Sequence, residues 1–438
     1  MRLAELLTEA PYQGYSYGYP HKTAYRPLRP PVALREAWAA EPRDALFLYL
    51  HVPFCEMRCG FCNLFTQARP KVELVNSYLA ALRRQAVQVR EALGKARFAR
   101  CAIGGGTPTF LAADQLDTLF DIAEEVLSTR LADVPVSLEV SPETIDADKL
   151  TLLKERGVER ISIGIQSFRE AETSAVGRPQ PAAIVRRALE LLQFADFPTL
   201  NIDLIYGLPG QTVDSWLASL EAALAYFPQE LYLYPLYVRP LTGLGKSERC
   251  WDDLRLDCYR QGRAHLLSRG WRQVSMRMFQ APHAPPSTGP VYCCQDDGMV
   301  GLGCGARSYT RRLHYSTEYA VGVRGVREIV ADYVSRPDAE FAQANYGFLL
   351  DDGEQRRRYV IQSLLTQDGL DLPAYQRRFH SDPLDDLPQL LELEPLCLAN
   401  RQGQNLILTA AGLERSDAIG PWLYSQRVGA LMAGYEYR

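Results

Sequence analysis

The stretch that decides the fold is LFLYLHVPFCEMRCGFC, residues 46–62. Its first part, Leu46–Val52, is continuously apolar or aromatic apart from one histidine, which predicts a buried strand. Cys55, Cys59 and Cys62 follow directly, with the spacing Cys-x3-Cys-x2-Cys. Loops at the carboxyl ends of parallel strands are where α/β enzymes place their chemistry. Three thiolates in such a loop favour an iron–sulfur cluster or a zinc site over incidental thiols.

The residues after the triplet bear on which metal group is expected. A structural zinc site is closed by a fourth Cys or His. Here Asn63, Leu64 and Phe65 follow Cys62, so no fourth ligand lies at close spacing. Three ligands on a four-iron cluster would leave one iron open to bind another molecule. A zinc-binding structural protein remains the alternative.

Working outward from this loop, strand and helix patterns alternate as far as residue 240. The five further predicted strands are Phe98–Ile103, Val136–Val140, Arg160–Ile165, Leu200–Tyr206 and Leu231–Val238. The predicted helices between them are Leu74–Leu93, Asp114–Ser128, Asp146–Arg156, Ala182–Gln193 and Val213–Tyr226. Six such units predict an α/β fold with a parallel sheet, as a partial (β/α)6 barrel or an open wound sheet.

The flanking regions have different patterns. Residues 1–43 form an arm rich in Tyr and Pro, expected to be extended or turn-like and either packed on the core or placed as a lid. Residues 44–240 are the barrel, and residues 241–350 are a barrel extension with the Gly-rich segment Gly298–Tyr309. Residues 351–438 are expected to form a winged-helix-like α+β module with a hairpin at Leu396–Leu408 and a closing helix from Ala410.

Composition excludes several classes of protein. Ten cysteines in 438 residues are far too few for a disulfide scaffold. The formal charge of −4 gives no basic field for nucleic acid or anionic membranes. The sequence has no run long enough to span a membrane and no secretion-signal pattern at its start. We therefore expect a cytoplasmic enzyme, with no nucleic-acid or membrane partner, whose thiols are free or metal-bound.

The run LYLHVPFCEMRCGFC resembles the signature of the radical S-adenosylmethionine (SAM) superfamily. Within it, the chain is similar to the HemN-like subfamily of the oxygen-independent coproporphyrinogen III dehydrogenase. The resemblance implies that Cys55, Cys59 and Cys62 hold a four-iron four-sulfur (4Fe–4S) cluster whose open iron binds SAM. It also implies an electron donor such as flavodoxin or ferredoxin, and reductive cleavage of SAM to a 5′-deoxyadenosyl radical.

Other motifs match the SAM-binding positions of that family, most of them at predicted strand ends. By resemblance, the glycine motif contacts the amino group of SAM, an acidic strand end binds its ribose, and an arginine binds its carboxylate. The residues implied are Tyr49, Gly105, Gly106, Thr107, Glu139, Gln166, Arg178, Asp203, Tyr234 and Leu236.

Two departures from the family pattern bear on the reaction. The coproporphyrinogen dehydrogenases carry a further cysteine where this chain has Leu64. The haem chaperones carry a His-containing motif before the Gly-rich segment, whereas Tyr292–Asp297 contains no His. These differences favour the branch of radical SAM methylases and cyclopropanases. Oxidative decarboxylation of the coproporphyrinogen type and a haem-chaperone role remain the alternatives.

The methylase branch implies two SAM molecules, the second of which donates a methylene group to an sp2 carbon of the substrate. Cys293, Cys294 and Cys304 are candidates for the substrate or second-SAM site, since they lie in or just before the Gly-rich segment. A flat aromatic small-molecule substrate is suggested by Trp271, Phe279 and the arm tyrosines. Those tyrosines are Tyr12, Tyr15, Tyr17, Tyr19 and Tyr25. The C-terminal module could also bind a partner enzyme.

Overall fold

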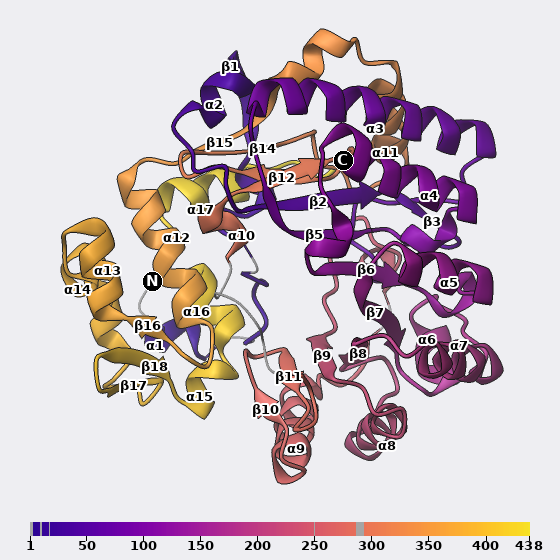
Figure 1. Ribbon diagram of the computed structural model, residues 1–438. Coiled ribbons are helices and arrows are strands. Elements are labelled where there is room, and N and C mark those ends of the chain that lie inside the picture. The colour runs from indigo at the N-terminus through magenta and orange to yellow at the C-terminus, as the bar shows by residue number, and fades with distance from the viewer. Residues whose placement is uncertain (1–2, 9–10, 17, 249, 286–292) are drawn as a thin grey trace.

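A mixed sheet of thirteen strands runs through the described part of the chain, with helices packed along it (Figure 1). The computed structural model describes residues 3–8, 11–16, 18–248, 250–285 and 293–438. Tyr17, Tyr292 and part of the predicted loop 282–290 therefore lie outside the described residues.

The centre of the sheet is the predicted set of six parallel strands. In spatial order they are β2 (Leu46–Val52), β5 (Phe98–Gly105), β6 (Val136–Val140), β7 (Val158–Gln166), β8 (Thr199–Tyr206) and β9 (Glu230–Pro235). The crossover helices are α3 (Val72–Leu93), α4 (Ala113–Asp121), α5 (Ala147–Glu155), α7 (Ala182–Ala195) and α8 (Val213–Leu224). The predicted α/β class with a partial barrel is confirmed. All six carboxyl ends meet at one edge, where a site is expected.

The sheet continues beyond the barrel on the β2 side, which the sequence pattern did not predict. Strand β12 (Met299–Leu302) lies parallel to β2, with Val300 opposite Leu48. Strands β13 (Arg307–Tyr309), β14 (Leu313–Ser316), β15 (Gln343–Leu349) and β1 (Arg26–Ala33) then follow in antiparallel pairs. All four residues of β12 are buried, so this part of the Gly-rich segment lacks the apolar–polar alternation of a half-exposed strand.

The N-terminal arm contains regular structure, so the expectation of an entirely extended or turn-like segment is wrong. Besides β1, it forms α1 (Leu3–Leu6), the 3-10 turn η1 (Lys22–Ala24) and α2 (Leu34–Ala39). Strand β1 tolerates its three prolines because it is the edge strand of the sheet, with an irregularity between Pro27 and Val32. At an edge, a missing N–H donor costs no ladder hydrogen bond.

The C-terminal module has its own small sheet and its own apolar core. The sheet orders β16 (Leu370–Asp371), β18 (Asn405–Leu408) and β17 (Ala399–Gln402), and the last two form the predicted hairpin. Around it lie α12 (Asp352–Leu364), α13 (Leu372–Phe379), α14 (Pro383–Asp386), η8 (Pro388–Glu392), α15 (Ala410–Leu413), α16 (Ser416–Trp422) and α17 (Gln426–Ala433). The predicted closing helix from Ala410 is three short helices. Tyr19 and Tyr25 of the arm are buried in this core.

The remaining elements connect or flank these parts. They are β3 (Phe54–Cys55), β4 (Gln67–Ala68), η2 (Pro108–Phe110), the π-helical η3 (Ile122–Val126), η4 (Leu131–Asp133), η5 (Pro142–Thr144), α6 (Glu170–Ala175), η6 (Leu244–Lys246), α9 (Arg255–Ser268), β10 (Arg272–Gln273), β11 (Met278–Gln280), α10 (Cys294–Asp297), α11 (Val323–Ser335) and η7 (Asp338–Ala342). Strands β11 and β10 extend the sheet beyond β9. Among the described residues, no helix is both long and apolar enough to cross a membrane.

Candidate active site

The cysteine loop leaves the carboxyl end of β2 and is tied down at several points. Strands β3 and β4 pair in parallel, which sets Cys55 opposite Ala68. The backbone N–H of Gly60 donates to the carbonyl of Val176 at 2.8 Å, and Leu244 donates to the carbonyl of Gly60 at 2.8 Å. The loop therefore rests on segments that follow β7 and β9, across the mouth of the barrel.

The three thiols of this loop are half-buried and meet hydrogen-bond donors. The guanidinium of Arg178 donates to Cys59 Sγ at 3.2 Å, and the hydroxyl of Thr107 donates to Cys55 Sγ at 3.5 Å. Burial raises the pKa of both thiols, while Arg178 opposes the shift at Cys59 and Thr107 opposes it at Cys55. Charge-assisted donors of this kind stabilise thiolates, the form that binds metal.

The donor set suits an iron–sulfur cluster, because three thiols share one loop and Asn63, Leu64 and Phe65 follow them, so no fourth Cys or His lies close by to close a zinc site. A Cβ on Gly106 would lie 2.9 Å from Cys55 Sγ, so glycine keeps the space beside this sulfur open. A 4Fe–4S cluster held by Cys55, Cys59 and Cys62 would supply the electron that cleaves SAM.

The glycine motif that ends β5 lies directly beside this loop. The N–H of Gly106 donates to the carbonyl of Val52 at 2.8 Å, and Thr107 donates to the carbonyl of Phe54 at 2.7 Å. Gly105 has φ +116°, a backbone conformation that favours glycine, and its N–H donates to Glu139 Oε2 at 3.0 Å. Burial raises the pKa of Glu139, and the Gly105 N–H opposes this shift. The structure thus brings Gly105, Gly106, Thr107 and Glu139 together.

A second acidic group, Asp203, lies on β8. It accepts hydrogen bonds from Asn201 Nδ2 at 2.8 Å and from the hydroxyl of Ser162 at 3.1 Å. Burial raises its pKa to about 6, although these two donors oppose the shift. The charge of Asp203 also contributes to the raised pKa of Glu139. Carboxylates placed like this can accept hydrogen bonds from ribose hydroxyls.

Gln166 is the last residue of β7, and Arg178 lies in the segment that follows this strand. Gln166 has φ +68°, at an irregularity in the β7–β8 pairing, and such a conformation in a residue other than glycine stores strain. Besides Cys59, Arg178 donates to the carbonyl of Gly164 at 2.9 Å and to Gln180 Oε1 at 3.3 Å. Its guanidinium is therefore fixed beside the cysteine loop, and its role toward the SAM carboxylate stays a prediction.

The aromatic residues predicted to line the site lie on β2 and at the end of β9. The Tyr49 hydroxyl lies 3.3 Å from His51 Nδ1. Tyr234 stacks on Tyr232, with ring centres 5.9 Å apart. Leu236 is buried one residue past the end of β9, not on the strand as predicted, and its N–H donates to the carbonyl of Tyr206 at 2.9 Å.

The cysteines predicted at a second site lie in different settings. Cys304 is fully buried, and its neighbour Tyr78 forms a hydrogen bond with it that opposes the burial-raised pKa of the thiol. The thiol of Cys293 donates to Gln362 Oε1 at 2.8 Å. Burial raises the pKa of Cys293 to about 11 and that of Cys294 to about 12. Their roles at a substrate or second SAM remain predictions.

Two tyrosines of the N-terminal arm contact aromatic residues of the barrel. Tyr12 packs edge-on against Tyr206, with ring centres 6.2 Å apart. Tyr15 packs against Tyr234 at 6.3 Å, and the guanidinium of Arg277 lies 3.8 Å from the centre of the Tyr15 ring. The arm therefore touches a residue predicted to line the SAM pocket, as the lid interpretation requires.

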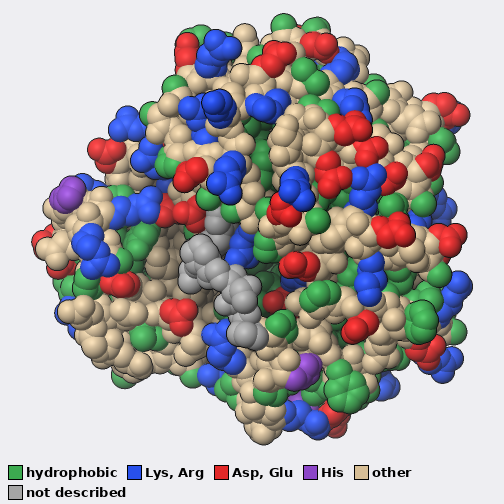
Figure 2. Space-filling view, viewed as in Figure 1, with side chains coloured by type: hydrophobic (Ala, Val, Ile, Leu, Met, Phe, Trp, Pro, Cys, Tyr) green, Lys and Arg blue, Asp and Glu red, His purple; other side chains and the backbone are tan. Residues whose placement is uncertain are grey.

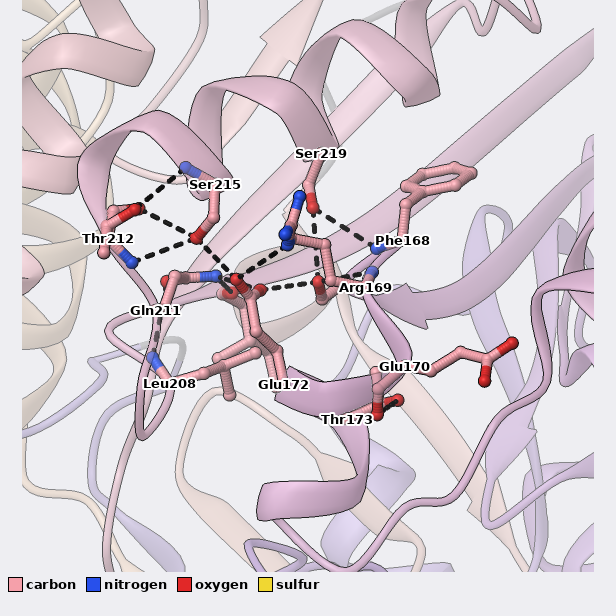
Figure 3. A network of polar contacts seen from close by, with 12 residues as sticks. Phe168, Arg169, Glu170, Glu172, Thr173, Leu208, Gln211, Thr212, Ser215 and Ser219 are labelled. Carbon is pink, nitrogen blue, oxygen red and sulfur yellow. Dashed lines mark hydrogen bonds and ion pairs between the residues drawn. The ribbon is translucent and has the colours of Figure 1, made fainter.

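One supporting residue escaped the sequence analysis, namely Glu172 on α6. Figure 3 shows its carboxylate at the centre of a polar network that joins the segment after β7 to the segment after β8 and to α8. It accepts hydrogen bonds from Ser167 at 2.6 Å, Gln211 at 2.9 Å and Ser215 at 2.5 Å. A single Glu in a helix gives no sequence signal of this role, because its partners are spread along the chain.

Comparisons with known proteins agree with this geometry. The family model described as the Radical SAM superfamily matches residues 49–223 of this chain. The oxygen-independent coproporphyrinogen III oxidase of Escherichia coli K12 is 29% identical over 91% of each chain. The haem chaperone HemW of Bacillus subtilis 168 is 34% identical over 60% of this chain and 70% of its own.

The solved structure of coproporphyrinogen III oxidase (HemN) from Escherichia coli, described as a radical SAM enzyme, superposes with a TM-score of 0.80. It is 25% identical and the match covers 93% of this chain and 96% of that one. The fold and the cysteine site thus define a radical SAM enzyme. Within that superfamily, the chain belongs to the HemN-like family of oxygen-independent coproporphyrinogen III oxidases and HemW haem chaperones. The zinc-protein alternative has no support.

Proposed function

We propose that this protein is a radical SAM oxidase that decarboxylates a tetrapyrrole with propionate side chains, such as coproporphyrinogen III. The observation that carries this proposal is the extent of the relationship to the Escherichia coli oxidase, which spans 91% of both chains and 96% of the solved oxidase structure. The reported HemW relationship covers only 60% of this chain.

The reaction balances with two one-electron partners from outside the site, a donor for the cleavage of SAM and an acceptor for the electron that the substrate releases. A propionate side chain, –CH2CH2COO⁻, gives one hydrogen atom to the 5′-deoxyadenosyl group and then releases CO2 and one electron to become a vinyl group. The electron passes to an oxidised one-electron carrier. In this proposal, Gly105–Thr107, Glu139 and Arg178 hold SAM, and the arm tyrosines keep water away from the radical.

The methylase and cyclopropanase interpretation gains nothing from these relatives, which are named as oxidases and chaperones. They favour the alternative of an oxidative reaction instead. Leu64, which stands where the dehydrogenases carry a further cysteine, does not change this preference, because three thiols suffice to anchor the cluster. A second SAM molecule stays a prediction without support.

The test uses anaerobically reconstituted protein, reduced with dithionite that is then removed, together with SAM, coproporphyrinogen III and an oxidised one-electron carrier as acceptor. We expect the wild type to form 5′-deoxyadenosine, CO2 and vinyl-bearing products. The Cys59→Ala variant should form none of the three. Formation of S-adenosylhomocysteine without CO2 would assign the reaction to the methylase branch and overturn the proposal.

A haem-chaperone role is the second candidate, favoured by the 34% identity to the Bacillus subtilis chaperone. Titration with haemin separates the two functions. Tight stoichiometric binding with a shifted Soret band, and no CO2 from coproporphyrinogen III, would support the chaperone. A flavodoxin or ferredoxin as electron donor, a partner of the C-terminal module and a cytoplasmic location are proposed on the same family grounds.

A further inference from the structure

The cysteine loop is bonded to the segment that leads into α3. The Arg69 side chain donates to the carbonyl of Glu56 at 3.0 Å, and the Arg69 N–H donates to the carbonyl of Cys55 at 2.9 Å. Lys71 then caps α3, and Val72 is the first residue of that helix. Arg69 and Lys71 are exposed, and Val72 is 63% exposed. The chain therefore presents two cations and one apolar side chain next to the first cysteine ligand.

The same loop is bonded to the segment that leads into α11. The Arg58 side chain donates to the carbonyl of Val321, and the Tyr319 hydroxyl donates to the carbonyl of Asn63 at 2.7 Å. Val323, the first residue of α11, is 48% exposed. Helix α11 also packs against α3 and β4. These contacts hold the starts of both helices against the cysteine loop.

Three exposed apolar side chains belong to this region. Leu64, two residues after Cys62, is 48% exposed, and Val72 and Val323 are the other two. Single exposed apolar residues are normal on a protein surface, whereas a group of them indicates a contact site. All three lie on the cysteine loop itself or within two residues of a hydrogen bond to it.

The charged side chains around them are mainly basic. The cations are Arg58, Arg69 and Lys71. Glu73 is acidic and exposed, while the Glu56 carboxylate accepts a hydrogen bond from Ser141 at 2.6 Å. On the face that Figure 2 draws, Lys and Arg side chains are interspersed with Asp and Glu side chains. A local excess of positive charge beside the cysteine loop favours an acidic partner.

The chemistry of the site requires such a partner, because the cleavage of SAM consumes one electron that comes from outside. The rate of electron transfer falls steeply with distance, so a carrier has to dock close to the cysteine ligands. Complexes of electron-transfer proteins are transient and use small surfaces, which a few apolar residues with charges around them provide.

We propose that these three apolar side chains and three cations form the docking surface of a small acidic one-electron carrier protein. The inference rests on the proposed function only for the use of a carrier protein as electron donor. The reduced carrier gives up one electron at this surface and leaves oxidised. That electron breaks the C5′–S bond of SAM, which gives methionine and the 5′-deoxyadenosyl radical.

The first test measures the binding of oxidised flavodoxin, an acidic carrier, to the reconstituted protein by calorimetric titration at low ionic strength. Lys71→Glu should raise the Kd about threefold, because a charge at the rim contributes modestly and its reversal adds repulsion. Val72→Ser/Val323→Ser should raise it roughly tenfold, because two apolar contacts are lost. Added salt should weaken binding by the wild type more than binding by Lys71→Glu.

Two matched controls lie at the opposite edge of the sheet. Lys95 is exposed and follows the far end of α3, and Phe227 is 70% exposed and precedes β9. Lys95→Glu and Phe227→Ser should bind flavodoxin as the wild type does. Equal Kd values for the wild type and the docking-surface variants, or no binding by the wild type, would overturn the proposal.

The second test compares two reductants in the formation of 5′-deoxyadenosine from SAM. With reduced flavodoxin, the docking-surface variants should show a raised KM for the carrier. With dithionite, a small ion that needs no docking surface, they should match the wild type, and their iron content should be unchanged. An equal loss with both reductants would show a damaged site and overturn the docking role.

Coproporphyrinogen III separates this inference from the proposed function. If the variants lose flavodoxin binding but the wild type releases no CO2 from this substrate, the docking surface stands and the oxidase assignment fails. If CO2 is released and the variants bind flavodoxin as the wild type does, the proposed function stands and the docking surface fails.

Discussion

At the scale of single residues, His51 makes the stability of the protein sensitive to acid. Its imidazole is 6% exposed and lies 3.3 Å from both Tyr49 Oη and the carbonyl oxygen of Phe65. Burial lowers its pKa to about 4. As the pH falls, the imidazole of the unfolded chain takes up a proton near pH 6.5, whereas the buried imidazole of the folded chain stays neutral until about pH 4. The protein therefore has its full stability with respect to this group above pH 6.5 and loses part of it as the pH falls toward 4.

The variant His51→Gln should lose less stability over that window. We expect the wild-type apoprotein to lose about 3 kcal/mol more than the variant between pH 6.5 and pH 4. Urea denaturation at three pH values measures the difference. Parallel pH profiles for the two proteins would contradict the assignment of this loss to His51.

Gly106 matters at the same scale, because its missing side chain makes room for the cysteine loop. A Cβ there would lie 2.4 Å from the carbonyl oxygen of Phe54 and 2.9 Å from Cys55 Sγ. Gly106→Ala should therefore displace the loop and reduce the iron and sulfide retained after reconstitution by more than about half, since close-packed backbone cannot absorb such an overlap. Gly429→Ala, where a Cβ meets nothing within 4 Å, should retain the wild-type content.

At the scale of elements, the hydrogen bonds of Glu172 connect the segments that follow β7 and β8 to α8 (Figure 3). Glu172 is 4% exposed, and its carboxylate accepts from Ser167, Gln211 and Ser215. Glu172→Gln turns one acceptor into a donor that faces these donors, so we expect a loss of about 1–3 kcal/mol in the free energy of unfolding. Glu190→Gln, on the exposed face of α7, should change it by less than about 0.5 kcal/mol. Equal values for the two variants would contradict this role.

Elements also show where sequence patterns succeed. Strands β2 and β6 have the predicted bounds, since apolar runs between helices of the right length define a parallel sheet locally. The sequence pattern did not predict β12, which is flanked by glycines, or β1, which contains prolines. Both segments form strands because of their place in the sheet. The cysteine site was predictable for the same local reason: its three ligands lie within eight residues.

At the scale of the whole molecule, one buried ion pair links the barrel edge to the C-terminal module. Arg277 precedes β11 and Asp417 lies on α16; their side chains are 5% and 1% exposed, and both carboxylate oxygens lie 2.6 Å from one guanidinium nitrogen. The Tyr237 hydroxyl donates to the same carboxylate. Such a pair orients the two parts, but its desolvation offsets much of its attraction.

Removing one partner of this ion pair should therefore lower the free energy of unfolding more than replacing both partners with apolar residues. We expect Asp417→Asn to lower the free energy of unfolding by about 3–5 kcal/mol, because it leaves Arg277 charged and buried. The double variant Arg277→Met/Asp417→Leu should recover most of that loss. A double variant that is less stable than Asp417→Asn in urea denaturation would show that the pair itself is strongly stabilising.

The sequence by itself determined the class of this protein. The apolar strand and the Cys-x3-Cys-x2-Cys loop are neighbours along the chain, so their geometry follows from local spacing. Only the tertiary structure decided which distant side chains meet, such as Trp38 with Tyr315 and Arg277 with Asp417. Such contacts join residues separated by up to some 280 positions. No periodicity or spacing encodes them, because they depend on how the arm, the sheet and the C-terminal module pack together.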